Sequence, residues 1–228
     1  MRKKVFISWS SGKDSAWALH ILRQDPSVDI AGLFCTVNKA FNRVAVHGVR
    51  TALLEQQARE VDLPLYIVEI PYPCDNEIYV KAFKTFVMTA EQMGISYFAF
   101  GDLFLEDVRA YREEILAGTG VKPLFPLWGM STHALSKEMI AQGLKAVITC
   151  LDPKHLGSEF AGRNYDESFL KDIPASVDPC GENGEFHSFA FDGPMFKDAI
   201  EIMSGRTIIR DGACYTDILP KPYDSHTR

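Results

Sequence analysis

One short stretch near the N-terminus combines residue types that bind phosphate. Residues 10–15 read Ser-Ser-Gly-Lys-Asp-Ser. The apolar run 4–9 before this stretch predicts a strand, and the run 16–22 after it predicts a helix. A tight turn between a strand and a helix directs backbone N–H groups and the positive end of the helix dipole at one point. We therefore expect an anion, and above all a phosphate, at this turn.

The order of these residues does not fit two common phosphate loops. A Walker A loop requires Lys followed by Ser or Thr, whereas Lys13 is followed by Asp14. The stretch also lacks the Gly-x-Gly-x-x-Gly spacing of a dinucleotide turn. A purely structural alternative is a capped turn in which Asp14 or Ser15 caps the helix through its side-chain oxygen. The position between the first strand and the first helix favours phosphate binding over this alternative.

Apolar runs that predict strands alternate with segments that predict helices over the first 130 residues. Strands are expected at 4–9, 29–37, 65–70, 96–100 and 122–127, and helices at 16–22, 49–61, 76–93 and 106–116. This alternation indicates an α/β fold with a doubly wound, parallel five-stranded sheet between two helical layers, a Rossmann-like sandwich. If the strand order is 3-2-1-4-5, the winding reverses between strands 1 and 4. Loop 10–15 then shares a crevice with the loop that begins Gly101-Asp102.

The pattern changes after residue 130. A helix is expected at 131–143 and a strand at 145–151, followed by a segment rich in glycine and proline and by strands at 187–192, 199–203 and 207–209. We therefore expect two domains, a larger one of residues 1–130 and a smaller α+β domain of residues 131–228. Apolar residues in the C-terminal tail are compatible with a homodimer.

Composition limits the class of protein. The 228 residues are 46% hydrophobic and 24% charged, as in ordinary folded proteins. A net charge of −6 disfavours a general nucleic-acid surface. No apolar run approaches the roughly 20 residues of a membrane span. The basic N-terminus is followed by an apolar run too short for a secretory signal, so we expect a cytoplasmic protein.

The loop resembles the PP-loop, Ser-Gly-Gly-x-Asp-Ser, of the ATP pyrophosphatases, a superfamily with the HUP type of Rossmann-like fold. Ser10, Gly12, Asp14 and Ser15 match this pattern, Lys13 occupies its variable position, and Ser11 stands where the first Gly is usual. Enzymes of this superfamily cleave ATP between the α- and β-phosphates and adenylate an oxygen of their substrate. The resemblance implies that Ser10, Ser11, Gly12 and Ser15 bind ATP, that Lys13 neutralises phosphate charge, and that Asp14 caps the helix or helps to hold Mg²⁺.

Further segments resemble the diphthine–ammonia ligase family, the amidating branch of the PP-loop enzymes. They are Gly101-Asp102, the Arg109-x-x-Arg112-Glu113 cluster, Pro-Leu-Trp-Gly at 126–129 and Asp-Pro-Cys-Gly-Glu-Asn-Gly-Glu-Phe-His at 178–187. The Gly-Glu-x-Gly-Glu-Phe part of the last segment is the most specific signature. Family members of known function condense ammonium with the diphthine carboxylate of elongation factor 2 and release AMP and pyrophosphate.

This resemblance implies an ATP-dependent amide-forming ligase with an ATP-binding domain at 1–130 and an acceptor-binding domain at 131–228. Its substrates would be ATP, ammonium and a carboxylate acceptor, which could be a protein side chain. The chain resembles the bacterial branch, and bacteria are not expected to contain diphthamide. It departs from the pattern at residues 102–108, which are acidic here and basic in the eukaryotic and archaeal enzymes. This difference concerns the identity of the acceptor substrate more than the reaction with ATP.

The same resemblance assigns nucleotide contacts at the end of the second strand. Adenine would lie against residues 33–37, where Phe34 and Thr36 would contact the nucleotide. His47 follows in a polar loop and is either a surface histidine or a further nucleotide contact. Gly101 and Asp102 would complete the nucleotide site from the facing loop.

The candidates for catalysis are Arg109, Glu182 and Glu185, together with Lys13 and Asp14. Arg109 is spaced i, i+4 from Glu113 and could form a surface ion pair. Arg109 or Arg112 would instead stabilise the leaving pyrophosphate if it faced the crevice. Glu182 and Glu185 are either turn carboxylates or groups that bind ammonium or the acceptor and accept a proton. A metal site built from Cys180, Glu182, Glu185 and His187 is disfavoured because its ligand set is mixed.

Three alternative functions remain open. A sulfur-inserting or lysidine-forming tRNA enzyme of PP-loop type would require a cysteine pair or a basic domain, and the five cysteines include no Cys-x-x-Cys spacing. A module that binds ATP or AMP without turnover would need only the nucleotide site. An adenine nucleotide α-hydrolase would release AMP without any acceptor.

Overall fold

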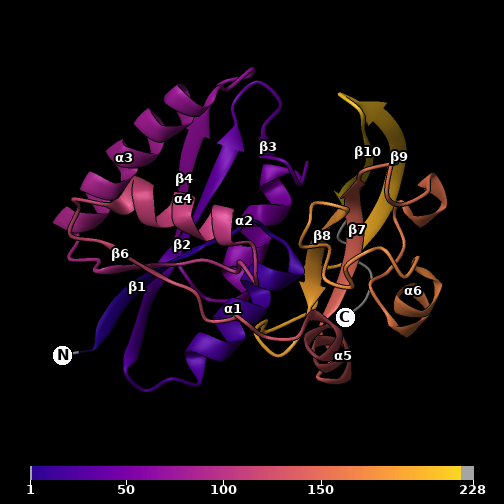
Figure 1. Ribbon diagram of the computed structural model, residues 1–228, viewed down its shortest axis with the longest axis horizontal. Coiled ribbons are helices and arrows are strands. Elements are labelled where there is room, and N and C mark those ends of the chain that lie inside the picture. The colour runs from indigo at the N-terminus through magenta and orange to yellow at the C-terminus, as the bar shows by residue number, and fades with distance from the viewer. Residues whose placement is uncertain (1, 222–228) are drawn as a thin grey trace, which may run out of the picture.

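The computed structural model describes residues 2–221 and contains two sheets (Figure 1). The elements of the first part are β1 (Lys3–Ser8), α1 (Lys13–Arg23), β2 (Val28–Asn38), β3 (Arg43–Val44), α2 (Thr51–Glu60), β4 (Leu65–Ile70), α3 (Asn76–Gln92), β5 (Tyr97–Ala99), α4 (Glu106–Leu116) and β6 (Lys122–Leu124). The elements of the second part are α5 (Thr132–Ala141), β7 (Lys145–Leu151), the 3-10 turn Ser158–Phe160, α6 (Glu167–Asp172), β8 (Phe186–Asp192), β9 (Ile202–Arg210) and β10 (Ala213–Pro220).

The first sheet has five parallel strands in the order β4-β2-β1-β5-β6. This is the 3-2-1-4-5 order, so the doubly wound, Rossmann-like α/β fold is confirmed. A sixth strand, β3, was not predicted. It is two residues long and pairs antiparallel with the last residues of β2, Val37 and Asn38. Such a short strand leaves no apolar run or alternation in the sequence.

Successive side chains of each strand point to opposite faces of the sheet, and both faces are apolar. Helices therefore cover both faces. On one face Phe6, Phe34 and Phe98 form an aromatic cluster with residues of α3 and α4. On the other face the neighbouring residues Val5 and Ile7 pack with α1 and α2. This second core continues into the C-terminal part without interruption. The division into residues 1–130 and 131–228 stays a prediction.

The second sheet is antiparallel, with the order β8-β7-β10-β9 (Figure 1). The smaller α+β part was expected, but its last strands differ from the prediction. One strand, β9, spans the region where two short strands were expected, and β10 was not predicted. Polar residues and Gly205 interrupt the apolar pattern of β9, and the turn at Asp211 and Gly212 returns the chain as β10.

The edge strand β9 exposes apolar side chains, as expected for the tail. Met203, Ile208 and Ile209 are 46%, 52% and 73% exposed. The homodimer with which they are compatible stays a prediction. Among residues 2–221, no helix has both the length and the apolar character that a membrane crossing needs.

A buried glutamine on α2 joins the two parts of the chain. The Gln57 side chain is inaccessible to solvent. Its amide nitrogen donates to the carbonyl of Ser11 at 2.9 Å and to that of Ala190 on β8 at 2.6 Å. Its amide oxygen accepts from the Trp9 indole N–H at 2.8 Å. All its hydrogen-bonding groups are used, so the amide links loop 10–15, the first sheet and the second sheet at one point.

We expect Gln57→Leu to lower the free energy of unfolding by about 2–4 kcal/mol, because it leaves the Trp9 N–H and the Ala190 carbonyl buried without partners. Urea unfolding followed by circular dichroism measures this loss. Gln56→Leu on the same helix is the control, because Gln56 is only half-buried and makes no such bonds. Equal losses in the two variants would contradict the role of Gln57.

Candidate functional site

Loop 10–15 connects β1 to α1 and is closed by its own hydroxyl groups. Gly12 is the residue before the helix, with an extended backbone. Ser10 Oγ lies 3.2 Å from Ser15 Oγ and accepts from the Gly12 N–H at 3.4 Å, while Ser15 Oγ donates to the Gly12 carbonyl at 3.0 Å. The first turn of α1 therefore begins at a small, hydroxyl-lined corner, where its N–H groups have no partner within the helix.

Ser11 takes the left-handed backbone conformation that the usual glycine would take. Its φ is 67°, in the region that favours glycine. The Ser11 carbonyl accepts two hydrogen bonds, from Gln57 and from the Ala190 N–H at 2.9 Å. Its hydroxyl is buried without a hydrogen-bond partner in the described residues. The surrounding structure therefore holds this conformation although the residue carries a Cβ.

The loop opens into a cavity of about 610 Å³. Twelve of the residues singled out from the sequence line it: Ser10, Lys13, Asp14, Ser15, Phe34, Thr36, His47, Gly101, Asp102, Arg112, Glu182 and His187. Ser11 and Gly12 lie behind the lining, within the loop itself. Arg109 and Glu185 do not line the cavity. The volume falls within the range usual for sites that bind small organic molecules.

Gly101 allows the two facing loops to approach each other. A Cβ placed on Gly101 would lie 3.0–3.1 Å from backbone atoms of Asp14 and Ser15. Real Cβ atoms rarely come so close to backbone, so only glycine fits here without displacing the start of α1. This contact places Gly101 and Asp102 beside loop 10–15, at the point where the winding of the sheet reverses.

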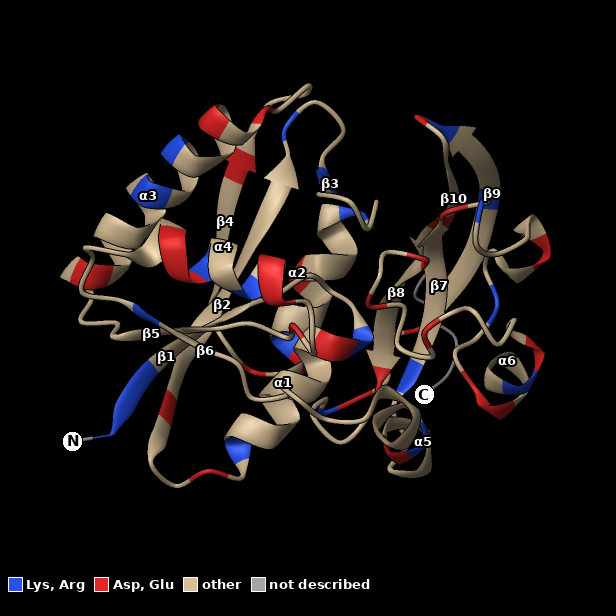
Figure 2. Ribbon diagram, viewed as in Figure 1, with Lys and Arg blue, Asp and Glu red and all other residues tan. Residues whose placement is uncertain are grey.

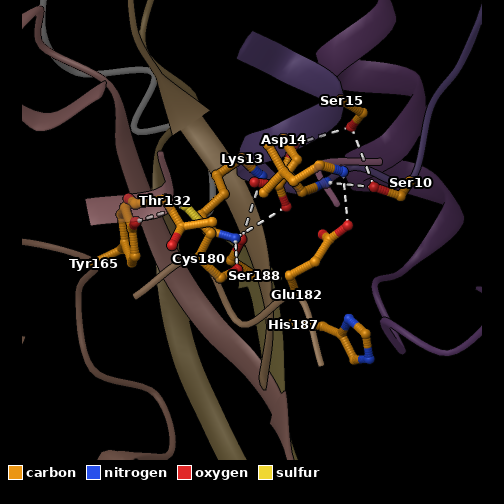
Figure 3. A network of polar contacts seen from close by, with 12 residues as sticks. Ser10, Lys13, Asp14, Ser15, Thr132, Tyr165, Cys180, Glu182, His187 and Ser188 are labelled. Atoms are coloured by element: carbon orange, nitrogen blue, oxygen red, sulfur yellow. Dashed lines mark hydrogen bonds and ion pairs between the residues drawn. The ribbon is translucent and has the colours of Figure 1, made fainter. Parts of the chain in front are cut away.

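The Lys13 ammonium points toward the C-terminal part (Figure 3). Its Nζ lies 2.9 Å from Asp14 Oδ2 and donates to the Cys180 carbonyl, and the rings of Tyr165 and Phe186 lie within 5.5 Å of it. Burial lowers the pKa of Lys13, but the neighbouring acidic groups, above all the Asp14 carboxylate, together outweigh it, so the pKa is raised overall. Lys13 is therefore charged and held by the protein itself. Its contact with phosphate stays a prediction.

Asp14 has one oxygen that the protein does not use. Oδ2 pairs with Lys13, whereas Oδ1 is buried without a hydrogen-bond partner in the described residues. A buried carboxylate oxygen of this kind is a suitable ligand for a divalent cation. No group of three or more potential metal ligands occurs in residues 2–221. A cation at Asp14 would thus take most of its ligands from phosphate and water, as is usual for Mg²⁺.

The two glutamates of the signature segment have different environments. Glu182 lines the cavity, and its Oε1 accepts from the N–H groups of Leu103 at 2.6 Å and Phe104 at 3.4 Å. Burial is the main cause that raises the pKa of Glu182 to about 7. A carboxyl group that titrates near neutral pH beside a cavity can accept and donate protons there.

Glu185 organises the segment from inside. Its side chain is buried and accepts from the N–H of Asp178 at 2.9 Å, the N–H of Asn183 at 3.0 Å and the Asn183 amide at 3.0 Å. Asp178 in turn accepts from the Cys180 N–H at 2.8 Å and from the Thr132 hydroxyl at 2.6 Å. These bonds favour a structural role, and a catalytic role of Glu185 stays an untested prediction.

Two histidines pack together at the cavity wall. The rings of His47 and His187 are 4.6 Å apart. His47 Nδ1 lies 3.1 Å from the Ser188 carbonyl, which can only accept, so Nδ1 carries the proton and Nε2 is free to accept. Burial lowers the pKa of His47 to about 4 and that of His187 well below its usual value. Both rings are therefore neutral at pH 7, and His47 is a wall of the cavity rather than a surface residue.

The arginines of α4 point in different directions. Arg109 pairs with Glu113 at 2.9 Å and packs over the rings of Phe125 and Trp128, outside the cavity. Arg112 lines the cavity instead. Of the two arginines considered from the sequence, the structure thus brings Arg112 to the site. The catalytic role predicted for Arg109 stays untested.

Sequence reasoning missed several residues that build the site from outside the motifs. Gln57 and Tyr165 are buried and act through hydrogen bonds to backbone carbonyls, of Ser11 and Pro179 respectively. Ser188 accepts from the Lys13 N–H through its hydroxyl at 3.2 Å. A polar residue inside the apolar stripe of α2 was the one signal that could have identified Gln57.

The fold and the cavity define a Rossmann-like α/β protein in which a small-residue loop after the first strand and a C-terminal segment face one cavity. Comparison with known proteins identifies the family. Residues 3–123 match the diphthamide synthase N-terminal domain, and residues 131–220 match the diphthamide synthase C-terminal domain. The chain belongs to the diphthamide synthase family.

Curated relatives carry the name diphthine–ammonia ligase. The protein of Danio rerio is 29% identical over 154 residues, which are 64% of this chain and 59% of that protein. The protein of Mus musculus is 26% identical over 153 residues, 64% of this chain and 56% of that protein. The match to the Schizosaccharomyces pombe protein covers 46% of this chain and 18% of that protein, with 26% identity. The chain thus spans less than 60% of the length of each of these relatives.

We expect Gly101→Ala to weaken the binding of α,β-methylene-ATP about tenfold, because the new Cβ displaces the backbone of Asp14 and Ser15. Isothermal titration calorimetry measures the dissociation constant. Gly120→Ala is the control, since a Cβ there meets only the flexible end of the Glu91 side chain. Unchanged affinity in Gly101→Ala would show that the close approach of the loops does not matter for the nucleotide.

The raised pKa of Glu182 predicts a pH-dependent stability. The folded protein keeps the Glu182 proton up to about pH 7, whereas an unfolded chain releases it near 4.5. The stabilisation is therefore complete below about pH 4.5 and is lost as the pH rises through 7. Wild-type protein should lose stability relative to Glu182→Gln between pH 5 and pH 8, measured by urea unfolding. The free energy of unfolding of Glu114→Gln, at an exposed position, should vary with pH as that of wild type does. The same pH dependence in Glu182→Gln would refute the raised pKa of Glu182.

Proposed function

We propose that this protein is an ATP-dependent ligase that adenylates a carboxylate and condenses it with ammonia. One observation carries the proposal: loop 10–15 and Glu182 of the signature segment line the same cavity. The name of the curated relatives, diphthine–ammonia ligase, supports a ligase that uses ammonia. The diphthine acceptor of the name is a property of those relatives, and we leave the acceptor of this chain as a carboxylate.

In this proposal the triphosphate of ATP lies at loop 10–15. The positive end of the α1 dipole and the hydroxyls of Ser10 and Ser15, which line the cavity, complement negative charge there. Adenine lies against the end of β2, where Phe34 and Thr36 line the cavity, with His47 as a neutral acceptor nearby. Gly101 and Asp102 close the opposite side.

The free oxygen of Asp14 suits a Mg²⁺ ion that accompanies ATP. When bound, such an ion would offset the charge of the phosphates. Lys13 supplies a second positive charge at the same place, but it does so from a fixed position between Asp14 and the Cys180 carbonyl. The loop therefore contributes charge and orientation, which is the main work of nucleotidyl transfer.

The reaction has two steps. An oxygen of the acceptor carboxylate attacks the α-phosphorus, the bond to the bridging oxygen breaks, and pyrophosphate leaves. The nitrogen of ammonia then attacks the acyl carbon, and AMP leaves with the former carboxylate oxygen. Ammonium must first lose a proton. Glu182 is suited to accept it, because its pKa of about 7 lies near a neutral working pH.

We expect turnover to yield AMP and pyrophosphate in equal amounts, and only when both ammonium and a carboxylate acceptor are present. Incubation with ATP, ammonium and a set of carboxylic acids, followed by ³¹P NMR, measures the products. Hydroxylamine in place of ammonium would trap the activated acyl group as a hydroxamate, which gives a coloured complex with ferric ion and makes the screen independent of the final product. Glu182→Gln should reduce amide formation about 10²-fold or more at pH 7, whereas Glu114→Gln should not.

The other outcomes identify the alternatives. ADP as the only product would refute the proposal. AMP released without an acceptor would indicate an adenine nucleotide α-hydrolase, and tight binding of ATP without turnover would indicate a nucleotide-binding module. A cytoplasmic location and a homodimer remain part of the proposal.

A further inference from the structure

Arg112 is held in the cavity by contacts on one edge and one face of its guanidinium group. The group lies over the ring of Phe100, 4.9 Å from its centroid. Its Nε donates to Asp102 Oδ2 at 3.4 Å. The side chain is 23% exposed, so the body is packed while the end reaches the cavity. Stacking and the carboxylate together fix the plane of the guanidinium.

The two terminal amino groups of Arg112 are open. No residue from 2 to 221 accepts a hydrogen bond from either of them. An arginine with its Nε edge occupied presents these groups as a planar pair of donors, which matches the two oxygens of a carboxylate. The geometry is that of a preorganised oxyanion clamp.

Within the described chain, Arg112 is the cation of this cavity whose two terminal amino groups are both left for a ligand. The cavity is lined by two basic side chains, Lys13 and Arg112, apart from the neutral histidines. The ammonium group of Lys13 is fully buried and is held by Asp14 and the Cys180 carbonyl. An acidic acceptor that enters the cavity therefore meets Arg112 as its available counter-charge.

The surface around Arg112 is apolar on one side and acidic on the other. Leu105, the residue before α4, and Val108 on α4 both line the cavity. Leu105 is three residues before Val108, and Val108 is four residues before Arg112, so these side chains lie along one side of the helix. Glu106 and Asp107 are exposed at the beginning of the same helix, where Figure 2 shows acidic residues. Apolar contacts suit an organic body, whereas neighbouring carboxylates disfavour a polyanion.

We propose that Arg112 binds the carboxylate of the acceptor, and that the acceptor is an organic acid with an apolar body that packs on Leu105 and Val108. The proposal rests on the proposed function and names the substrate class and a residue that selects it. Arg112 is placed for this role because its partner Asp102 follows Gly101, whose backbone contacts Asp14 and Ser15. The acceptor carboxylate would thus lie beside the phosphates that it attacks.

The test uses the whole chain labelled with ¹⁵N-arginine and three probes: 3-phenylpropionate, acetate and inorganic pyrophosphate. Each is titrated with and without saturating α,β-methylene-ATP, and the side-chain signals of Arg112 are followed by NMR. We expect saturable shifts with both carboxylates, with 3-phenylpropionate binding about tenfold more tightly than acetate because its ring buries apolar surface. Arg112→Gln should weaken 3-phenylpropionate about tenfold or more.

The controls separate charge, position and folding. Arg59→Gln removes the same charge from an exposed position on α2 and should leave binding unchanged. Arg112→Lys keeps a charge without the planar fork and should bind only weakly, which gives a second variant if Arg112→Gln does not fold. Loss of binding in Arg109→Gln instead of Arg112→Gln would overturn the proposal.

Other outcomes are equally decisive. Shifts of Arg112 with pyrophosphate and not with the carboxylates would assign it to the leaving group and overturn the proposal. Absence of saturable shifts with any carboxylate would overturn it as well. The nucleotide arm is repeated on a uniformly ¹⁵N-labelled sample and read at the backbone amide signals of residues 10–15. Failure of ATP binding, which counts against the proposed function, is thereby distinguished from failure at Arg112.

Discussion

The site depends on one backbone carbonyl, that of Ser11. It accepts hydrogen bonds from the Ala190 N–H and from the Gln57 side chain, and so it lies where both sheets meet. These bonds hold Ser11 at a positive φ, and that turn directs Gly12 and the start of α1 toward the cavity. Without partners on β8 and α2, this conformation would be unfavourable for a residue with a Cβ. The geometry of the loop is therefore set by tertiary contacts more than by the loop sequence.

Lys13 extends the same coupling through charge. Its ammonium group links Asp14 of the loop to the carbonyl of Cys180, at the start of the signature segment. Glu182 of that segment then accepts hydrogen bonds from the backbone of the loop after β5. Three segments far apart in sequence thus meet through two charged side chains. Movement of the C-terminal part would change the environment of Lys13 and Asp14 directly, so the two sheets are best regarded as one functional unit.

The sequence predicted the parts of the site that follow from strand order. Parallel strands end at one edge of a sheet, so loop 10–15 and Gly101 could be placed together before the structure was known. The role of a single side chain could not be deduced in this way. Glu182 and Glu185 are three residues apart in one motif, yet one lines the cavity and the other is buried among N–H donors. Arg109 and Arg112 differ likewise, because a shift of three residues on a helix changes direction by about 60°.

The site has two parts that differ in how they are held: loop 10–15 with Glu182, and the cavity wall formed by α4. Loop 10–15 and Glu182 are held by hydrogen bonds between side chains and backbone, from Lys13 to the Cys180 carbonyl and from the Leu103 N–H to Glu182, and none of these bonds involves the wall formed by α4. Arg112 and Val108 belong to α4, and Leu105 directly precedes it. The start of this helix carries the acidic residues Glu106 and Asp107. Substitutions on this helix alter the wall of the cavity without disturbing the bonds that hold the loop. If Arg112 binds the acceptor as proposed, a change of acceptor would therefore act through this wall of the cavity and leave the bonds of loop 10–15 in place.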